Sequence, residues 1–527
     1  MSSLIPSTNQ LVDLFNEFQS KLSSRQEART GIITAAALIT TYALYKQFFA
    51  KSKDTCPAVP YKIPIFGSTG DYIKDPQAFA EKWTAELGEV YRVHLFGEMV
   101  TVVSGRYVRE IMLNSNFNFI TSVMKRFDMN ALARIPAHIV TGDASRKVVV
   151  NKLTPSLKRY TPRAVENLIV GLADIVGDLD EPKELPHVYQ LVQRMVARAS
   201  ASVFVGEVLC KDSDLVDIFQ NITIDIGSLL RPKIPIMMFF PRLMGLQMRI
   251  LGKFSPKVQK YRQNMIIGMS PEIEKRLEGA KNPGWERPDD ILQDILEDNP
   301  PEPGTSVAEH CVNWMFSLIF ASVHTTSENA TVVIYRLLEN PELMNELLEE
   351  QNEVLRRHGV ESGKGSEAFS FDIIKEFVKL DSVCREALRL KNQYFELSHT
   401  NISGKNVVLS NGVVIPPDAD VYINYWYNHR DASYKGATAD DDLAEFKPYR
   451  FVNTGRPSTK VSDDFLLFGE GKHACPGRWF AIQEIKTIIS LLLRDYTLRP
   501  AEKIKFPTTI MTGMPSGKVI IEKKQRK

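Results

Sequence analysis

The stretch FGEGKHACPG, residues Phe468–Gly477, organises the interpretation of the whole chain. The glycines at positions 469 and 471 permit a tight turn whose backbone angles are resisted by residues that carry a Cβ atom. Cys475 is followed by Pro476, which suits the first position of a helix because its missing N–H costs nothing there. Apolar residues then recur at helical spacing: Trp479, Ile482, Ile485, Ile489 and Leu492. The pattern predicts a cysteine on a rigid loop at a helix N-terminus, where the helix dipole and free N–H groups favour a thiolate.

Two further residues of this stretch indicate that the cysteine binds a group rather than only packing in a turn. Gly477 leaves room for a flat group to lie against the backbone, and His473 supplies a basic side chain nearby. A buried cysteine in an ordinary turn would not require both of them together with the two glycines. The five cysteines include no Cys-x-x-Cys pair, which argues against a disulfide scaffold and a structural zinc cluster.

At these residues the sequence resembles the cytochrome P-450 family of haem-thiolate monooxygenases, whose signature is met by Phe468, Gly471, Cys475 and Gly477. The resemblance implies that Cys475 is the axial ligand of the iron of haem b (iron protoporphyrin IX), and that the other three residues shape the cofactor loop. His473 stands where most members of the family carry an arginine that binds a haem propionate. Imidazole can still donate to that carboxylate, although more weakly when it is neutral.

Glu386 and Arg389 lie three residues apart in LDSVCREALRL, so a helix places them side by side. The spacing alone carries no information, because Glu89–Arg92 and Glu353–Arg356 share it and most such pairs are solvated surface contacts. Order singles out Glu386, which precedes the cysteine loop with the stretch FKPYRF between them. The resemblance implies that Arg450 of that stretch completes a Glu–Arg–Arg network under the haem, with a structural rather than a catalytic role.

The run CVNWMFSLIFASV (Cys311–Val323) is apolar nearly all round, as expected of a helix that passes through the core. It leads into ASVHTT, which resembles the oxygen-activation motif of the family. The resemblance places Thr325 at the alcohol that relays protons during cleavage of O2. His324 replaces the usual acid and Ser322 a frequent glycine, and because imidazole titrates near neutrality His324 can still shuttle protons. The alternative for Thr325 is a threonine that only caps or back-bonds its helix.

Composition and periodicity set the fold class. The chain has 527 residues, 44% of them hydrophobic and 24% charged, with a net charge of +2. This balance argues against a nucleic-acid binder that depends on overall basicity, and against a disordered chain. Residues 88–104 are typical of a β-hairpin broken at Gly97-Glu98, and residues 407–426 are also strand-like. Helical periodicity dominates between them, with breaks near 281–288 and 300–304. We therefore expect a mainly α protein with a small β-sheet built from both ends (α+β). The resemblance implies that this is the cytochrome P-450 fold.

The N-terminal region contains a candidate membrane anchor. Residues 30–50 are apolar apart from Lys46, and at about 1.5 Å per residue a helix of this length spans roughly the 30 Å core of a bilayer. The alternative is a buried or amphipathic helix. The predicted organisation is an N-terminal segment at 1–29, a transmembrane anchor at 30–50, a Pro-rich linker at 51–67 and a haem-thiolate catalytic domain at 68–527. The resemblance implies a single-pass protein of the endoplasmic reticulum membrane with a cytosolic catalytic domain.

The resemblance also implies the partners. Electrons would come from NADPH through NADPH-cytochrome P-450 reductase, with cytochrome b5 as a second donor, since the chain shows no flavin or dinucleotide-binding module of its own. A basic face formed by residues 146–158, Lys472 and Arg478 could receive an acidic donor, although helix solvation explains these charges equally well. His138, His310 and His399 lack metal-ligand spacing and are interpreted as packing or surface residues. No residue is assigned to the second propionate.

On the substrate side, family position assigns the pocket to four stretches, residues 116–126, 316–325, 394–400 and 511–515. Their apolar composition predicts a bulky apolar substrate. Residues 231–242 resemble the membrane-dipping region of the family, with core packing as the alternative. The layout is most similar to fungal enzymes of the ent-kaurene oxidase type that act on terpenoids and steroids. The prediction is a membrane-bound monooxygenase that hydroxylates such a substrate with O2. The alternatives are a haem-thiolate isomerase or dehydratase that does not use O2, and a non-catalytic haem- or steroid-binding membrane protein.

Overall fold

The computed structural model describes residues 56–63, 65–140, 143–230, 235–391, 394–430, 442–509 and 514–524. The N-terminal segment at 1–29, the predicted anchor at 30–50 and the start of the predicted linker at 51–67 lie outside these residues. Among the helices that are described, none combines the length and the apolar character needed to cross a bilayer.

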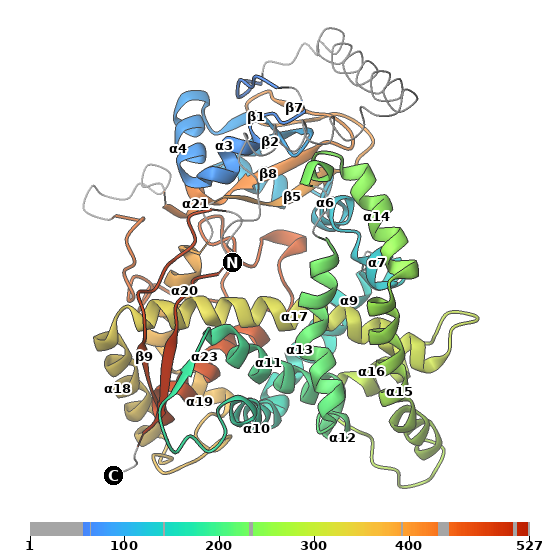
Figure 1. Cartoon of the computed structure of the whole chain (residues 1–527), viewed down its shortest axis with the longest axis vertical. Coiled ribbons are helices and arrows are strands. Elements are labelled where there is room, and N and C mark those ends of the chain that lie inside the picture. Colours follow the sequence, from blue (N-terminus) through green and yellow to red (C-terminus); the bar gives the residue numbers. More distant parts are fainter. Residues whose placement is uncertain are drawn as a thin grey trace, which may run out of the picture.

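Helices dominate the described chain, and the longest of them, α17 (Val307–Leu338), crosses the middle of the molecule in Figure 1. The helices before it are α3 (Thr69–Lys74), α4 (Pro76–Leu87), α5 (Tyr107–Met112), α6 (Phe119–Arg126), α7 (Met129–Ala133), α8 (Ala137–Val140), α9 (Ala144–Val148), α10 (Leu157–Val176), α11 (Val188–Phe204), α12 (Gly206–Leu209), α13 (Ser213–Gly227), α14 (Pro241–Phe254), α15 (Pro256–Gly279) and α16 (Ile291–Asp298). Those after it are α18 (Pro341–Arg357), α19 (Phe371–Lys375), α20 (Val378–Arg389), α21 (Tyr425–Arg430) and α23 (Arg478–Asp495). Short turns of π or 3-10 helix are η1 (Val149–Leu153), η2 (Thr154–Ser156), η3 (Ser228–Leu230), η4 (Pro235–Phe239) and η5 (Gly471–His473).

The strands are short: β1 (Val90–Leu95), β2 (Glu98–Val103), β3 (Phe117–Asn118), β4 (Lys183–Leu185), β5 (Phe395–Asn401), β6 (Val407–Val408), β7 (Val414–Ile415), β8 (Asp420–Asn424), β9 (Tyr496–Pro500) and β10 (Val519–Lys523). The largest sheet has the order β1-β2-β8-β5-β3, and smaller ones have the orders β4-β10-β9 and β6-β7. Since β8 lies beside β2 in parallel register, the sheet joins segments from both ends of the chain. The expected mainly α architecture with a small β-sheet is confirmed.

The predicted hairpin is present, because β1 and β2 pair in antiparallel register from Val90↔Val103 to Leu95↔Glu98. Gly97 closes the turn at a φ of +83°, and a Cβ there would lie 2.0 Å from the carbonyl oxygen of Phe239. The prediction of strand over residues 407–426 is wrong at its end, because β8 stops at Asn424 and α21 begins at Tyr425. The side-chain amide oxygen of Asn424 accepts the N–H of Tyr427 and starts the helix instead.

The helical centre follows the sequence pattern closely. The predicted breaks fall between α15 and α16 and between α16 and α17. Helix α17 packs against α11, α13, α15, α20 and α23, and most of its side chains are buried. Because α17 is enclosed on so many sides, exposed residues near its middle are the exception.

Candidate active site

The cysteine loop is closed by its own backbone. The N–H of Cys475 donates to the carbonyl oxygen of Phe468 at 2.7 Å, and the Phe468 side chain is buried. Gly471 begins the turn η5 at a φ of +67°, and a Cβ there would lie 2.7 Å from the carbonyl oxygen of Met112 in α5. Glycine is therefore required at position 471 both by the backbone angle and by the neighbouring helix.

Helix α23 begins just after the cysteine, at Arg478, with Gly477 as its N-cap. The helix starts two residues later than the sequence predicts, because Pro476 and Gly477 form a turn. Burial raises the pKa of the Cys475 thiol above its ordinary value, while the backbone N–H groups of Gly477 and Arg478 act in the opposite direction. The helix terminus acts on the thiol as the sequence predicts, because its N–H groups lower the pKa, but burial opposes them. A bound cation displaces the proton of a ligating thiol, so this cysteine suits a metal ligand.

A pair of histidines lies beside the loop, with ring centroids 5.9 Å apart. His473 bonds the backbone of Phe117, and Nδ1 of His399 lies 2.5 Å from the carbonyl oxygen of Leu397. The Nε2 atoms of both rings are buried and have no hydrogen-bond partner within the described part of the chain. Burial lowers the pKa of both, that of His399 to about 4. A carboxylate placed against these nitrogens would draw a proton onto each ring and accept a hydrogen bond from it.

His399 is therefore not only the packing or surface residue that the sequence suggested. It lies on β5, which is distant in sequence from the cysteine loop, and no spacing links the two segments. Only the fold brings His399 next to His473.

The predicted glutamate–arginine network is formed. Arg389 donates to Glu386 through both Nε (2.7 Å to Oε2) and Nη2 (2.8 Å to Oε1), and Nε of Arg450 donates to Oε1 at 3.0 Å. The backbone N–H of Lys447 also donates to Oε1, at 3.1 Å. The Glu386 side chain is completely buried, whereas Glu353 and Arg356, which share the spacing, are exposed on α18. Burial and the third partner distinguish this pair from its surface counterpart.

His429 connects this network to the cysteine loop, and no sequence motif indicated it. Its Nδ1 lies 2.8 Å from the carbonyl oxygen of Arg389, and its own carbonyl oxygen accepts from Nη1 of Arg389. Its Nε2 accepts the N–H of Leu466 at 2.9 Å, two residues before Phe468. These bonds assign the proton of the neutral ring to Nδ1, and burial lowers the pKa of His429 to about 3. The ring is thus a neutral link between α20 and the start of the loop.

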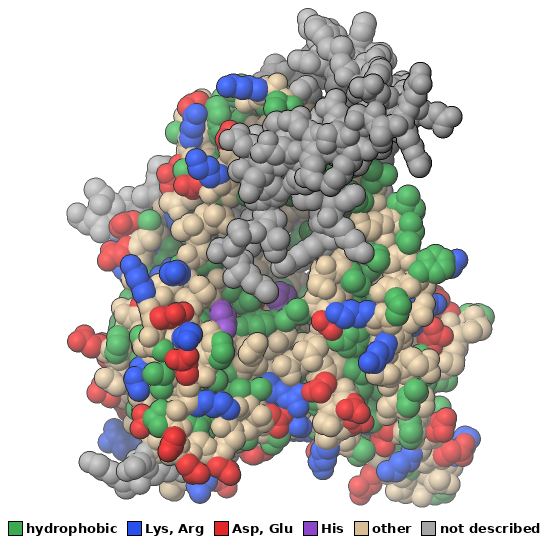
Figure 2. Space-filling view, viewed as in Figure 1, with side chains coloured by type: hydrophobic (Ala, Val, Ile, Leu, Met, Phe, Trp, Pro, Cys, Tyr) green, Lys and Arg blue, Asp and Glu red, His purple; other side chains and the backbone are tan. Residues whose placement is uncertain are grey.

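Thr325 lies on the accessible side of α17. Thr325 and Ala321 are exposed and Phe320 and His324 are half-buried, although the neighbouring turns of the helix are buried. Figure 2 shows the molecule hollowed near the middle of this face, with hydrophobic and histidine side chains at the edge of the hollow. The Thr325 hydroxyl donates to the carbonyl oxygens of Ala321 (2.9 Å) and Ser322 (3.3 Å), so the back-bonding alternative describes its geometry correctly. Its oxygen still has a free acceptor site toward the open space.

His324 bonds a tyrosine from another helix. Its Nδ1 lies 2.7 Å from the hydroxyl of Tyr189, near the start of α11. Burial raises the pKa of Tyr189, which keeps the phenol protonated, and the ring nitrogen is the acceptor this hydroxyl finds among the described residues. Nδ1 of His324 thus accepts, and the proton of the neutral ring lies on Nε2. Burial also lowers the pKa of His324, so the ring is neutral at physiological pH and serves as a hydrogen-bond donor. Sequence reasoning missed Tyr189 because no motif includes it.

These residues fit a haem. A bound haem accounts for three separate observations: a cysteine at the end of a closed loop, two imidazoles whose buried Nε2 atoms have no partner among the described residues, and an accessible turn on a core helix. At Gly477, a Cβ would meet nothing within 4 Å, so the open space beside this residue is not filled by the described protein. Cys475 would hold the iron, and His473 and His399 would hold the propionates.

The predicted substrate stretches come together only in part. Helix α6 packs against β5, joined by a 2.8 Å hydrogen bond from the Ser122 hydroxyl to Ser398, and the Phe119 ring lies 5.7 Å from His399. The cations at the end of α6, Lys125 and Arg126, both pair with Asp420 at 3.3 Å. Residues 231–234 and 510–513 of the other predicted regions lie outside the described residues.

The predicted basic face is smaller than the sequence suggests. Lys152 pairs with Asp298 at 2.5 Å and Lys158 with Asp372 at 2.6 Å. The Arg478 guanidinium donates to the carbonyl oxygens of Thr459 (3.0 Å) and Cys475 (2.7 Å), so it braces the loop. The remaining cations include Arg146, which donates to the Lys472 carbonyl oxygen at 3.2 Å, together with exposed Lys147 and Lys472.

Comparison with known proteins agrees with this geometry. The family model of cytochrome P450 matches residues 57–524. The chain is 26% identical to cytochrome P450 monooxygenase olcJ of Penicillium canescens, over 81% of this chain and 79% of that protein. It is 28% identical to cytochrome P450 monooxygenase hepE of Aspergillus oryzae (80% and 74%) and 27% identical to cytochrome P450 monooxygenase AtmP of Aspergillus flavus (79% and 77%).

Proposed function

The chain belongs to the cytochrome P450 family and is a haem-thiolate monooxygenase, and from that premise we propose that it hydroxylates a bulky apolar substrate at a membrane surface. A terpenoid or a steroid is the substrate class that we infer. The observation that carries the proposal is the combination of the closed Cys475 loop with the accessible turn of α17 that presents Thr325.

The proposed roles of the residues follow from their contacts. When bound, the haem supplies the chemistry that inserts one atom of O2 into a C–H bond while the other atom leaves as water. Cys475 holds the iron through sulfur, and His473 and His399 orient the cofactor through its carboxylates. Glu386, Arg389 and Arg450 hold the loop in place through buried charge-assisted hydrogen bonds.

Thr325 and His324 are proposed to handle protons on the substrate side. The Thr325 hydroxyl accepts and passes on a proton at Oγ1, and His324 holds one at Nε2. Tyr189 fixes the orientation and the tautomer of His324, so the pair replaces the acid of the family motif. The sequence predicts that His324 shuttles protons by titrating near neutrality. We propose instead that it acts as a neutral hydrogen-bond donor, because burial lowers its pKa.

Electron supply is proposed to come from NADPH through a separate reductase, with cytochrome b5 as a second donor. Arg146, Lys147 and Lys472 offer an acidic partner a small positive face close to the cysteine loop. Electrostatic attraction between complementary faces accelerates such encounters more than it tightens them.

Attachment to the endoplasmic reticulum membrane is proposed through the anchor at residues 30–50, with the catalytic domain at 68–527 on the cytosolic side. Helix α14 supports a second contact with lipid. Leu243, Leu246, Ile250 and Phe254 are each 50–65% exposed and recur at helical spacing. An apolar stripe of this kind suits a helix lying in a membrane interface and extends the dipping region predicted at 231–242.

The test uses the full chain in detergent or nanodiscs with a fungal NADPH-cytochrome P-450 reductase. A panel of terpenoids and steroids is screened for a shift of the haem Soret band, and each binder is then tested for substrate-dependent NADPH consumption and a hydroxylated product. We expect a binder to raise NADPH consumption and to gain one oxygen atom from O2. Turnover without O2 or NADPH would favour the isomerase or dehydratase, and binding without turnover would favour a non-catalytic protein.

A further inference from the structure

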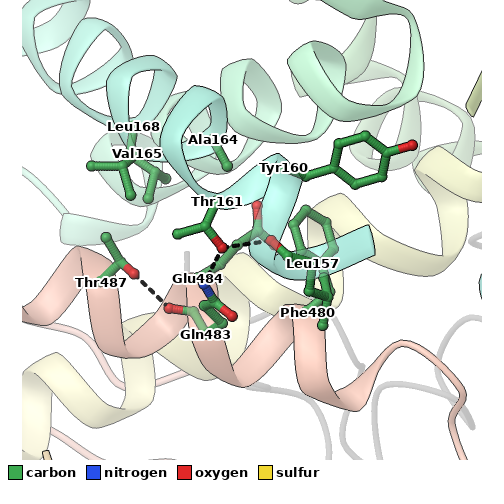
Figure 3. Close-up of a pocket in the computed structure, with 10 residues that line it drawn as sticks. All are labelled: Leu157, Tyr160, Thr161, Ala164, Val165, Leu168, Phe480, Gln483, Glu484 and Thr487. Carbon is green, nitrogen blue, oxygen red and sulfur yellow. Dashed lines mark hydrogen bonds between the residues drawn. The ribbon is translucent and has the colours of Figure 1, made fainter. Parts of the chain in front are cut away.

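A small cavity lies between α10 and α23, away from the accessible turn of α17. Figure 3 shows side chains of the two helices facing each other across it. Its lining is mainly apolar, with Leu157, Ala164, Val165, Leu168 and Phe480 among its walls. Its volume, counted as the space that the centre of a water molecule can occupy, is about 10 Å³. This is close to the minimum that a single water molecule requires, and too small for an organic ligand.

Glu484 of α23 places a carboxyl group in this cavity. Its side chain is only 2% exposed, and neither Oε1 nor Oε2 finds a hydrogen-bond partner among the residues that the structure describes. Three of the neighbouring polar side chains, Thr161, Gln483 and Thr487, already form hydrogen bonds. Nε2 of Gln483 donates to the Thr161 hydroxyl at 2.5 Å, and the Thr487 hydroxyl donates to the Gln483 carbonyl oxygen at 2.8 Å.

No charged group in the described part of the chain compensates this carboxyl group. Lys158, Arg159 and Arg163 of α10 pair with Asp372, Asp289 and Glu207, and Lys486 of α23 pairs with Asp381. Burial is the one influence on the pKa of Glu484, and it raises that pKa well above the ordinary value. Tyr160, the other ionisable residue of the lining, also has a raised pKa and stays neutral. Glu484 is therefore a neutral carboxylic acid at physiological pH.

A neutral acid still needs partners, because its O–H must donate and its C=O must accept. Leaving both hydrogen bonds unformed in an apolar site costs free energy, and one water molecule can bond to the O–H and to the C=O. The same water can donate to the free lone pairs of Thr161 or Thr487, which line the same space. We propose that the cavity between α10 and α23 is a binding site for one internal water molecule, held by the acid group of Glu484.

The site couples protein stability to pH, with a defined sign. The folded chain keeps a proton on Glu484 at pH values where the unfolded chain has already released it. Stability therefore decreases as pH rises above the ordinary pKa of a glutamic acid, about 4.3, toward the raised pKa of the folded state. Over that window the folding equilibrium constant falls about tenfold per pH unit on account of this one group.

The experiment compares the full-length holoprotein with Glu484→Gln, which keeps the size and the hydrogen-bonding atoms but cannot ionise. Glu484→Leu is a second variant with an apolar side chain, and Glu353→Gln removes an exposed carboxylate as the matched control. Unfolding by urea is measured from pH 5 to pH 8, and infrared spectra are recorded at pH 7. Relative to wild type, Glu484→Gln should gain about tenfold in folding equilibrium constant per pH unit, with no such gain in Glu353→Gln. Glu396, whose pKa burial raises to about 7, contributes a carbonyl band of a protonated carboxylic acid in every variant. In the difference spectrum between wild type and each Glu484 variant, a further such band should be lost, and the difference spectrum between wild type and Glu353→Gln should show no such loss.

A crystal structure tests the water directly. We expect ordered density within hydrogen-bonding distance of the Glu484 carboxyl group in wild type, and its loss in Glu484→Leu. The proposal is overturned by a dry cavity in wild type. It is equally overturned if wild type and Glu484→Gln depend on pH in the same way, or if Glu484→Gln loses no protonated carbonyl intensity relative to wild type.

Discussion

Replacing Glu386 with glutamine should destabilise the protein severely without touching the cofactor site. The carboxylate accepts four hydrogen bonds, two from Arg389, one from Arg450 and one from the backbone of Lys447, all between 2.7 and 3.1 Å. Glutamine keeps one acceptor oxygen but places an NH2 group against a guanidinium donor, and it removes the buried counter-charge of Arg389. Breaking one partner out of a buried ion pair costs about 3–5 kcal/mol. Total stabilities are about 5–15 kcal/mol, so this loss threatens the fold itself.

The assay is urea unfolding followed by the haem-thiolate Soret band. With a slope of about 3 kcal/mol per molar urea, the expected loss lowers the midpoint by about 1–1.7 M. The control is Glu353→Gln, which has the same spacing to an arginine but is exposed, and should stay within about 0.5 kcal/mol of wild type. If Glu386→Gln lies within 1 kcal/mol of wild type, or if the control loses as much, the network does not support the loop.

Three further predictions concern the substrate side and the partner face. Thr325→Ala should retain the haem spectrum but release several-fold more hydrogen peroxide per NADPH, and unchanged coupling would remove Thr325 from the proton path. Tyr189→Phe should lower coupling several-fold while unfolding stability falls by only about 1 kcal/mol, the net worth of one hydrogen bond; a purely structural Tyr189 predicts altered stability with normal coupling. Lys147→Glu should slow reduction by the reductase several-fold at low salt but leave reduction by dithionite unchanged. Lys158→Gln, whose charge is already paired with Asp372, should leave both rates of reduction unchanged. An equal effect of both lysine variants would place the partner elsewhere.

The sequence predicts the parts of the site that depend on local pattern. The closed loop around Cys475, the central helix α17, the hairpin β1–β2 and the helix after the cysteine are all encoded by glycine positions and by periodicity within single segments. The Glu386 network was also predicted, but only through order along the chain and the family resemblance, because its spacing recurs on the surface at Glu353–Arg356.

The rest depends on contacts between segments that no motif connects. Three residues acquire their roles from neighbours on other elements. His399 lies beside His473, His429 bonds Arg389, and Tyr189 bonds His324. Their sequence surroundings are those of ordinary strand and helix residues. The burial that raises the pKa of the Cys475 thiol also depends on the whole fold, whereas the helix terminus that opposes it is visible in the local sequence.

The proposed function depends on a bond between the Cys475 sulfur and a haem iron. The carbon monoxide difference spectrum of the reduced full-length protein tests this bond most directly. Wild type should show the strongly red-shifted Soret band that thiolate ligation produces. Cys475→His should lose that band even where haem remains bound. A wild-type protein that binds no haem, or a red-shifted band that persists in Cys475→His, would contradict the assignment of Cys475 as the iron ligand.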